Sequence, residues 1–494
     1  MKMPPKRARG NGSGSSGEKT AAAEMVEFLN ASWTAFHAVS VVAERLKLSG
    51  FVQISERDNW ASLKPNGRYF FTRNGSTIMA FAIGGKYKPG GGFRIIGAHT
   101  DSPCPKLKPV SKQTKSGMLT VNCQPYGGGL WYTWFDRDLS VAGRVVLKVG
   151  DKLEQRLVRI DRPIMRIPSL AIHLDRGVND GFKVNFQNHV APILATSIKD
   201  ELGAGKAKQD QKSDGAGLLP QHPLLIQLLC EELQCEPESI VDFELQACDT
   251  QPSAIGGAKD EFVYSGRLDN LAMSFTSTKA LIDSLGSQAE DDCVRVVALF
   301  DHEECGSCSA QGAGSPVMMD LVKRVTRRLA AASLGQPGFE THIQIHEAIE
   351  ISLQKSFLVS ADMAHALHPN YSERHEPQHG PAFHKGIVIK HNANQRYATN
   401  SITAALFREC ARRRDIPFQE FVVRSDMGCG STIGPIVATD TGMRTVDVGI
   451  PQLSMHSIRE RCGTDDVDYA VRHFVAFWEE MGHIETDLLL SVDI

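Results

Sequence analysis

The chain of 494 residues is 42% hydrophobic and 22% charged, a composition typical of globular proteins and large enough for two or more domains. Its 54 Lys and Arg residues are offset by 57 Asp and Glu residues, and the formal net charge of -3 excludes a global basic field for nucleic acid or for an anionic membrane surface. No stretch approaches the roughly 18 consecutive apolar residues of a membrane span, and the 11 cysteines are scattered rather than spaced as a disulfide framework, so we expect a soluble, cytoplasmic protein without nucleic-acid or membrane partners.

Residues 1–20 are predicted to form a disordered tail. The opening MKMPPKRARGNGSGSSGEK is basic and then rich in Gly and Ser, and it lacks the apolar residues whose burial would offset the entropy of ordering. An organelle-targeting leader is the alternative, because such leaders are also basic, Ser-containing and poor in acidic residues. A second polar segment, GAGKAKQDQKSDGAG at 203–217, interrupts the middle of the chain.

Residues 21–103 begin with a predicted helix pair and continue with strands. Apolar residues recur at helical spacing in AAAEMVEFLNASWTAFHAVSVVAERLKLSGF, and Gly50 is a helix stop signal. The runs GRYFFTRN, STIMAFAIGG and FRIIGAHTD are strand-like and are separated by turn-rich pieces. Among these pieces, GGKYKPGGG lacks the Lys-Ser/Thr ending of a phosphate-binding loop, so it predicts a hairpin turn.

Residues 104–249 have a different sequence pattern and are predicted to form an inserted β-rich domain. The runs SVAGRVVLKVG and KLEQRLVRI alternate like strands, and Gly occupies positions 127–129. From 250 to 494, helical patterns such as LDNLAMSFTSTKALIDSL alternate with apolar runs such as VRVVALF, SFLVSAD, FVVRSD and RTVDVGI. This alternation predicts an α/β domain, built from 21–103 and 250–494, in which a mixed sheet is sandwiched by helices.

Polar side chains that can bind metal follow the ends of several predicted strands: His99 and Asp101, Glu303 and Glu304, Asp362, and His456. In open α/β sheets ligands gather beyond the carboxyl ends of the strands, so we expect these groups to converge in one crevice. Asp269, which opens a helix in GRLDNL, adds a further carboxylate. Each residue alone has an ordinary structural interpretation, such as a hydrogen-bonded His or a helix N-terminal charge, and only the convergence indicates a site.

The charges of these residues suit two zinc ions. Two divalent cations bring four positive charges, which Asp269, Glu304, Asp362 and a hydroxide would neutralise. Two metal ions bridged by a shared carboxylate occur in aminopeptidases. Adjacent residues of an extended chain point in opposite directions, so Glu304 can bind metal while Glu303 faces the attacking water as a general base.

Six motifs occur in an order and at separations that resemble the aspartyl aminopeptidases, a family of co-catalytic zinc exopeptidases: GAHTDSP, SGRLDNL, DHEECGS, SADMAHALHPNY, KHNANQRYAT and MHSIRE. The resemblance covers nearly the whole chain after about Ala21. It implies two Zn²⁺ per subunit, for which Mn²⁺ or Co²⁺ can substitute. The metal ligands that it implies are His99, Asp269, Glu304, Asp362 and His456.

The resemblance also implies how these residues divide the work. Asp269 would bridge the two ions, Glu303 would be the catalytic base, and Asp101 would orient His99 and raise its basicity. A zinc-activated hydroxide would remove N-terminal Asp, and also Glu, from peptides. The inserted domain would make dimer contacts, and the dimers would assemble into a homo-dodecamer.

Lys390 is expected to read the acidic side chain of the substrate. In GIVIKHNANQRYAT it stands where an apolar strand gives way to a polar loop, which is where such sheets place ligand groups. A cation in a partly dehydrated pocket attracts a carboxylate more strongly than it does in water, and the resemblance points to the same Lys. Tyr397 of this motif is assigned to substrate binding with it. His173, in PSLAIHLDR, resembles a His that the family offers to a neighbouring subunit's site, although a strand residue is equally consistent with the sequence.

Three other functions compete with this interpretation. A co-catalytic zinc deacylase or carboxypeptidase could use the same ligand set. The pair Cys305 and Cys308 forms a CxxC motif, which would indicate redox chemistry if it opened a helix beside a strand. A non-catalytic shell protein on the same fold would have lost Glu303 or a metal ligand, and none of these is missing.

Overall fold

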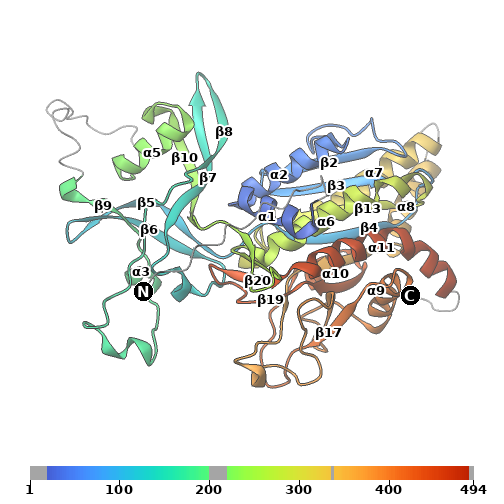
Figure 1. The fold of residues 1–494 in the computed structure, drawn as a ribbon. Coiled ribbons are helices and arrows are strands. Elements are labelled where there is room, and N and C mark those ends of the chain that lie inside the picture. Colours follow the sequence, from blue (N-terminus) through green and yellow to red (C-terminus); the bar gives the residue numbers. More distant parts are fainter. Residues whose placement is uncertain (1–18, 200–219, 335–338, 489–494) are drawn as a thin grey trace, which may run out of the picture.

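A computed structural model describes residues 19–199, 220–334 and 339–488 of the chain. Figure 1 shows a large α/β body beside a smaller part made mostly of strands. The predictions for the tail, up to residue 18, and for the polar segment at 203–217 lie outside the described residues. None of the helices in the described ranges combines the length and the hydropathy needed to span a bilayer.

The α/β body is built on a nine-stranded mixed sheet with the strand order β1-β2-β3-β13-β4-β14-β18-β16-β17. The central strands β13, β4, β14 and β18 run parallel to one another, so their carboxyl ends lie at one edge. Every residue of β3, β4, β13 and β14 is buried, as expected for apolar strands covered on both faces. The strands are β1 (Val52–Gln53), β2 (Arg68–Arg73), β3 (Thr77–Ile83), β4 (Phe93–His99), β13 (Val294–Phe300), β14 (Phe357–Ala361), β16 (Ile387–His391), β17 (Phe418–Val422) and β18 (Arg444–Gly449).

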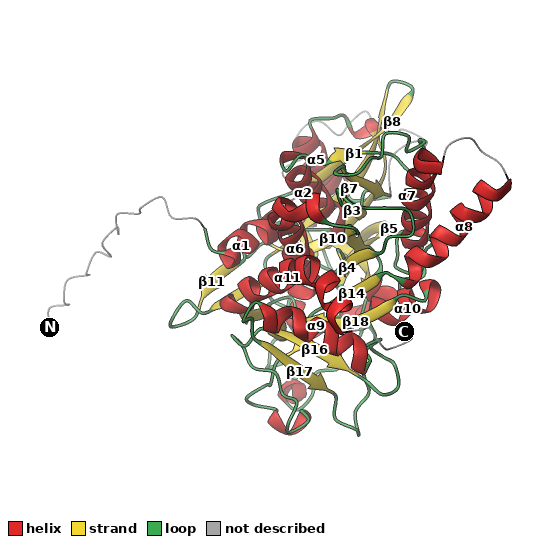
Figure 2. Ribbon diagram, turned by 90° about the vertical axis from the view of Figure 1, so that its right-hand side faces the viewer, coloured by secondary structure: helices red, strands yellow, loops and turns green. Residues whose placement is uncertain are grey.

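Helices cover both faces of this sheet (Figure 2). In β13, Val297 and Leu299 pack under one group of helices, whereas Val296 and Ala298 pack under the other, because successive side chains of a strand point to opposite faces. The predicted sheet sandwiched by helices is therefore confirmed. The first group comprises α1 (Ala21–Ala31), α2 (Ala35–Leu48), α6 (Leu268–Asp283), α9 (Ser401–Arg413) and α11 (Thr464–Leu488); the second comprises α7 (Val317–Leu334), α8 (Phe339–Gln354) and α10 (Ile433–Thr441).

The predicted helix pair at 21–50 is present as α1 and α2. The side chains of Thr20 and Thr34 accept hydrogen bonds from backbone N–H groups of the first turns and so cap the two helix starts. Gly50 follows α2 with φ 82°, a left-handed conformation that Gly adopts without the steric cost of a side chain. The local sequence signals therefore define both ends of the pair.

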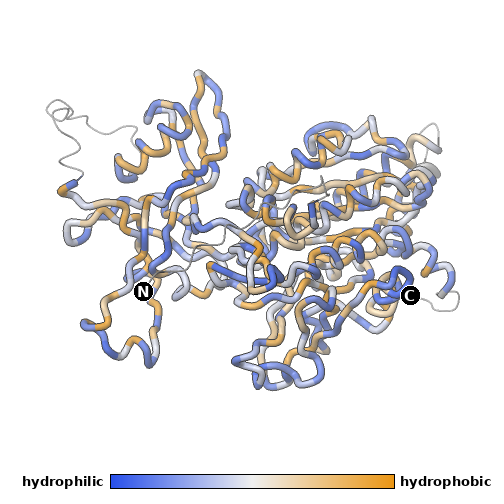
Figure 3. Tube along the Cα trace, viewed as in Figure 1, coloured by the Kyte–Doolittle hydropathy of each residue, from blue (hydrophilic) through white to orange (hydrophobic). Residues whose placement is uncertain are grey.

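The smaller part is an antiparallel sheet with the strand order β8-β7-β10-β5-β6-β9 and an apolar core of its own. The hairpin of β7 and β8 projects from it and carries both hydrophobic and hydrophilic residues (Figure 3). All of its elements come from within 104–249: β5 (Cys104–Lys115), β6 (Met118–Tyr126), β7 (Leu139–Val149), β8 (Lys152–Arg159), α3 (Phe186–His189), β9 (Ile193–Thr196), α5 (Pro223–Leu233) and β10 (Ile240–Asp249).

A third sheet, in the order β11-β12-β20-β19-β15, lies at the junction of the two parts (Figure 1). The loop between β19 and β20 carries His456, whose backbone oxygen accepts a hydrogen bond from Leu130 N of the smaller part at 2.9 Å. The junction therefore brings one candidate ligand against residues that follow β6. The strands are β11 (Ala254–Gly256), β12 (Phe262–Ser265), β15 (Ala364–His365), β19 (Pro451–Leu453) and β20 (Glu460–Gly463).

Several local predictions differ from the structure. The segment GGKYKPGGG is not a hairpin turn, because β13 lies between β3 and β4 in the sheet. The run FVVRSD is mostly a loop, since β17 ends at Val422 and Arg424 turns back to pair with Asp426. The helices α7 and α8 were not predicted, although apolar residues recur at helical spacing in VMMDLVKRVTRRLAAASL.

Candidate active site and metal centre

The carboxyl ends of the central strands place the polar residues around one point. β13 pairs with β4 in parallel, with Phe300 opposite His99, so the turn after β13 lies beside the last residue of β4. β14 flanks β4 on its other side and ends at Ala361, directly before Asp362. Ligand-type side chains from neighbouring strands therefore face one another at this edge of the sheet.

Asp269 lies between the imidazoles of His99 and His456. Its Oδ1 is 3.3 Å from His99 Nε2, and its Oδ2 is 3.3 Å from His456 Nε2. Glu304 Oε2 lies 3.4 Å from His456 Nε2, and Asp362 Oδ1 lies 3.6 Å from His99 Nε2. A carboxylate that offers one oxygen to each of two ligand groups has the arrangement of a ligand bridging two ions.

Asp101 connects His99 to the turn that carries the two glutamates. His99 Nδ1 lies 3.1 Å from the backbone oxygen of Asp101 and 3.3 Å from its Oδ1. The Asp101 carboxylate accepts hydrogen bonds from Glu303 N at 3.2 Å and from Glu304 N at 3.0 Å. It is buried, with 4% of its surface exposed. Asp101 therefore fixes the His99 ring and the position of the turn together.

Glu303 and Glu304 form part of a short 3-10 helix, and the prediction of an extended chain here is wrong. The reason is His302, whose φ of 63° turns the chain sharply after the end of β13. The two side chains nevertheless diverge: Glu304 Oε2 lies 3.4 Å from His456 Nε2, whereas Glu303 Oε2 lies 3.8 Å from His99 Nε2. The 3-10 geometry, and not strand alternation, thus separates the two carboxylates.

The CxxC motif lies in this same region without the structure that redox chemistry requires. Cys305 and Cys308 are exposed free thiols, and the next helix begins only at Val317. Catalytic CxxC thiols have a lowered pKa, often at a helix N-terminus, whereas partial desolvation of the Cys305 sulfur raises the pKa of this thiol. The redox interpretation is therefore not supported.

Electrostatics show how strongly the cluster attracts positive charge. Burial raises the pKa of Glu303 to about 8, and it also raises the pKa of Glu304. Burial opposes protonation of His456, but the Asp269 and Glu304 carboxylates and the Gly128 backbone oxygen together outweigh it and raise the His456 pKa to about 10. So many buried carboxylates require compensating positive charge, from protonated imidazoles or from bound cations.

The donor atoms of the cluster fit zinc. Among the described residues, His99 Nε2, Asp269 Oδ1 and Glu304 Oε1 are buried without a hydrogen-bond partner. Buried polar atoms are normally satisfied, so three unsatisfied ones in a group indicate a ligand. Donor atoms of His99, Asp269 and Glu304 lie within 4.8 Å of one another, as do those of His99, Glu303 and Asp362. Imidazole nitrogen and carboxylate oxygen are both zinc ligands.

Two of the three predicted substrate-binding residues lie together beside this cluster. Lys390, in β16, is 2% exposed; its Nζ donates a hydrogen bond to Met363 O at 3.0 Å and lies 3.9 Å from Asp362 Oδ2. The same Nζ is 5.1 Å from the centre of the buried Tyr397 ring. His173 is not part of this group, and it is not a strand residue, because it lies in an exposed turn of the smaller part.

Glu460 is a site residue that was not predicted. Its buried carboxylate accepts hydrogen bonds from His456 N at 2.8 Å and from Asp269 N at 3.2 Å, and so links the backbones of two candidate ligands. Burial raises its pKa to about 8. Its position in the MHSIRE motif, four residues after His456, was the signal that could have identified it.

Two residues of the smaller part were also missed. The Tyr126 hydroxyl donates a hydrogen bond to Asp101 Oδ2 at 2.6 Å, and Gly128 O accepts one from His456 Nδ1 at 2.9 Å. Nothing in the local sequence connects these residues to the motifs, since the pairing depends on how the two parts dock. The run of Gly at 127–129 was the only local sign of close packing.

A family model described as aminopeptidase I zinc metalloprotease (M18) matches residues 28–478. The chain belongs to the M18 family of zinc aminopeptidases. This M18 enzyme is 57% identical over 490 residues to a probable aspartyl aminopeptidase of Ricinus communis, with 95% of this chain and 97% of that protein covered. It is 47% identical to an aspartyl aminopeptidase of Dictyostelium discoideum, with 94% and 97% covered. The resemblance carried by the six motifs is confirmed.

Solved structures agree with the family. The M18 chain matches one in a structure of the complex of Ape4 and Nbr1 with a TM-score of 0.88 and 46% identity, covering 96% of this chain and 88% of that one. It matches the chain of the S. cerevisiae mApe1 dodecamer with a TM-score of 0.79 and 30% identity, covering 95% and 99%. The α/β architecture of this enzyme is therefore that of M18 aminopeptidases.

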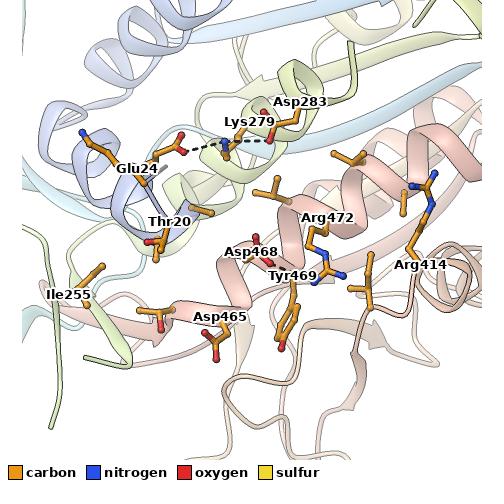
Figure 4. A pocket seen from close by; sticks show the side chains of 18 of the residues that line it. Thr20, Glu24, Ile255, Lys279, Asp283, Arg414, Asp465, Asp468, Tyr469 and Arg472 are labelled. Carbon is orange, nitrogen blue, oxygen red and sulfur yellow. Dashed lines mark ion pairs between the residues drawn. The ribbon is translucent and has the colours of Figure 1, made fainter. Parts of the chain in front are cut away.

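A cavity of about 1250 Å³ in this M18 enzyme is separate from the candidate site. It is lined by α1, α6 and α11 and includes none of the candidate catalytic or ligand residues. Figure 4 shows Lys279 reaching between Glu24 and Asp283 at its upper side, and Tyr469 on α11. The cavity lies over the helices that cover the sheet and not at the strand ends.

Proposed function

We propose that this M18 aminopeptidase removes N-terminal Asp or Glu from peptides and that it holds two Zn²⁺ per chain. The observation that carries the proposal is the position of Asp269, which presents one oxygen to His99 Nε2 and the other to His456 Nε2, each at 3.3 Å. The relatives named as a probable aspartyl aminopeptidase, at 57% identity, and as an aspartyl aminopeptidase, at 47% identity, support the acidic substrate class.

The five ligands divide into two sets that share Asp269. We infer that His99 and Asp362 hold one ion and that Glu304 and His456 hold the other, since Asp362 Oδ1 lies 3.6 Å from His99 Nε2 and Glu304 Oε2 lies 3.4 Å from His456 Nε2. Three carboxylates and one hydroxide balance the charge of two Zn²⁺. A site with this charge count needs no further counter-ion.

Proton transfer is the task of Glu303. Bound zinc supplies Lewis-acid chemistry, which polarises the first peptide carbonyl and lowers the pKa of water. Glu303 accepts the proton of the attacking water and then donates it to the leaving amine. Its side chain is 14% exposed, so it faces the ligand cluster while remaining accessible to substrate. Asp101 holds both the Glu303 turn and the His99 ring in place during these steps.

Lys390 is the cation that we assign to the acidic side chain of the substrate. Its ammonium group has three donors, and one of them is used by Met363 O. The Tyr397 ring and the neighbouring strands exclude water, which strengthens an attraction between Lys390 and a substrate carboxylate. The nearby Asp362 carboxylate offsets part of this charge, but a zinc ion on Asp362 would restore it.

Lys390→Met is expected to lower kcat/KM for Asp-peptides about 30-fold or more, because removing one partner of a buried charge pair costs about 2 to 5 kcal/mol. The change for Ala- and Leu-peptides should be much smaller. The measurement is a panel of dipeptides with N-terminal Asp, Glu, Ala or Leu, each with a free and an acetylated amine, on wild type and variant with zinc content determined on the same samples.

The matched control is Lys385→Met, which removes an exposed Lys just before β16 and should leave the substrate ratios unchanged. An unchanged preference for Asp over Ala in Lys390→Met would show that another cation reads the side chain. Cleavage of acetylated peptides in preference to free ones would replace the aminopeptidase by the runner-up, a zinc deacylase, and release of the C-terminal residue from longer peptides would indicate a carboxypeptidase.

The smaller part, residues 104–249, is proposed to join subunits into dimers and the dimers into a homo-dodecamer. Leu153 of β8 is 69% exposed, and Leu170 and Leu174 are 61% and 74% exposed in the loop that carries His173. Exposed apolar side chains that follow one another closely in the chain, as Leu170 and Leu174 do, are typical of surfaces that contact other proteins. His173 would then reach the site of a neighbouring subunit. The mApe1 structure described as a dodecamer supports this assembly.

Light scattering is expected to give a mass about twelve times the 54.1 kDa of one chain. The double variant Leu170→Asp and Leu174→Asp should shift the mass toward smaller species, because charges replace the apolar contacts. A wild-type monomer at working concentration would reject the assembly. Leu48→Asp, at an 89% exposed position of the α/β body, is the matched control, and disassembly in that variant would move the interface away from the smaller part.

A further inference from the structure

The segment that follows β6 touches the candidate metal centre at several points. Tyr126, the last residue of β6, donates from its hydroxyl to Asp101 Oδ2 at 2.6 Å. Two residues later Gly128 O accepts a hydrogen bond from His456 Nδ1 at 2.9 Å, and Leu130 N donates to His456 O at 2.9 Å. The inserted sheet and the α/β body therefore meet at the site itself.

Close approach of this segment depends on Gly127. Its φ is 72°, and a Cβ built on it would lie 3.1 Å from the Cβ of Glu304. A side chain at this position would therefore push against the turn that carries the candidate base and ligand. The absence of a side chain lets Tyr126 and Gly128 contact Asp101 and His456 at the same time.

The Tyr126 hydroxyl donates to the Asp101 carboxylate, which also contacts Glu303, Glu304 and His99. Asp101 Oδ2 accepts from Tyr126 and from Glu304 N, while Oδ1 accepts from Glu303 N and lies 3.3 Å from His99 Nδ1. Without the hydroxyl, Oδ2 would keep a single donor, and rotation of the carboxylate would disturb Oδ1 as well. Loss of the Tyr126 hydroxyl would thus disturb the positions of both the His99 ring and the Glu303 turn.

We propose that Tyr126 is a positioning residue of the metal centre: its hydroxyl, supplied by the inserted sheet, holds the Asp101 carboxylate in the orientation that supports His99 and the Glu303–Glu304 turn. The proposal rests on the proposed function, because it concerns the same site. Its consequence is that the inserted sheet has a part in catalysis beyond joining subunits. Lys106 Nζ lies 3.7 Å from the centre of the Tyr126 ring. This cation–π contact helps to hold the ring in the position from which its hydroxyl reaches Asp101.

The test is Tyr126→Phe, which removes the hydroxyl and keeps the ring. Changes in groups that orient metal ligands cost about 10- to 100-fold in metal affinity or activity. We expect a fall of this size in kcat for an Asp-peptide with KM within about threefold of wild type, since the hydroxyl donates to Asp101 and acts through it. Zinc affinity, measured by chelator competition, should also fall, and the absorption spectrum of the Co²⁺-substituted protein should change.

The control for the chemical change is Tyr469→Phe, on α11 beside the separate cavity, which should leave all three readouts unchanged (Figure 4). A structural role alone would lower the melting temperature of the metal-free and the zinc-loaded protein equally, without altering the Co²⁺ spectrum. That result, or wild-type values of kcat, zinc affinity and spectrum in Tyr126→Phe, would overturn the proposal.

A double-mutant cycle with Asp101→Ala tests whether the Tyr126 hydroxyl acts through the Asp101 carboxylate. If it acts only through Asp101, then adding Tyr126→Phe to Asp101→Ala should lower zinc affinity by less than about twofold further. Independent, additive losses would reject the coupling. Failure of the proposed function is recognised separately, because Glu303→Gln would then remain active or the wild type would bind no zinc, whatever Tyr126→Phe does.

Discussion

Glu303→Gln is expected to lower kcat by about 10² to 10⁴, the range for loss of a general acid or base. The amide cannot accept the proton of water, yet it has nearly the same size as the carboxylate. Glu303 N, not its side chain, donates to Asp101, so the turn and the ligand Glu304 should keep their positions. The variant should retain its fold and its zinc, and the loss should fall on kcat, measured with an Asp-peptide.

The matched control is Glu290→Gln, whose side chain is 76% exposed and pairs with Lys86 on the surface. It makes the same chemical change far from the strand ends and should have wild-type kcat. Turnover near the wild-type rate in Glu303→Gln, with zinc content verified, would remove Glu303 from its role as the base.

Asp269→Ala is expected to remove both zinc ions and with them all measurable turnover. Its two oxygens face two different imidazoles, so neither ligand set is complete without it. The remaining ligands would place two cations next to each other with no carboxylate between them, a repulsion that is severe at about 4 Å in a buried site. Zinc analysis after desalting should find close to none, and added zinc should no longer raise the melting temperature, because a ligand stabilises only the state that binds it.

Asp292→Ala, at a side chain that is 79% exposed, is the corresponding control and should keep the wild-type metal content. Retention of both ions by Asp269→Ala would contradict the bridge. Retention of one ion would assign Asp269 to a single ligand set and would reduce the role of the shared carboxylate.

The fold was largely readable from the sequence because its central strands are uninterrupted apolar runs. VRVVALF and FRIIGAH are buried at every residue, and strands covered on both faces have this pattern. The helix pair at 21–50 was readable for a similar reason, since its apolar spacing and Gly50 are local signals. The order of strands was not, because adjacency of β13 to both β3 and β4 depends on contacts between segments about 200 residues apart.

The candidate ligands could be picked out as a set because each follows a strand end or opens a helix. The strand pattern did not predict the backbone conformation after β13. There His302 adopts φ 63°, and the two glutamates that follow it lie in a 3-10 turn. A left-handed residue of this kind leaves no periodic signal in the sequence.

The supporting contacts were out of reach for a different reason. Tyr126 meets Asp101 across the junction of two sheets, and no spacing or motif relates residues of separate structural units. Glu460 could more easily have been predicted from the sequence, because it lies in the same motif as His456, and its carboxylate accepts a hydrogen bond from His456 N. Groups that support the candidate ligands thus depend on tertiary docking, whereas the candidate ligands themselves lie at strand ends and at one helix start.

The most direct test of the two-ion centre is a zinc titration of the metal-free wild-type protein, followed by hydrolysis of a free-amine Asp-peptide. Two ions that share Asp269 predict that activity rises until two equivalents of zinc per chain are bound and then stays constant, with the metal-free protein inactive. A plateau at one equivalent, or activity that does not depend on zinc, would contradict the shared, two-ion centre.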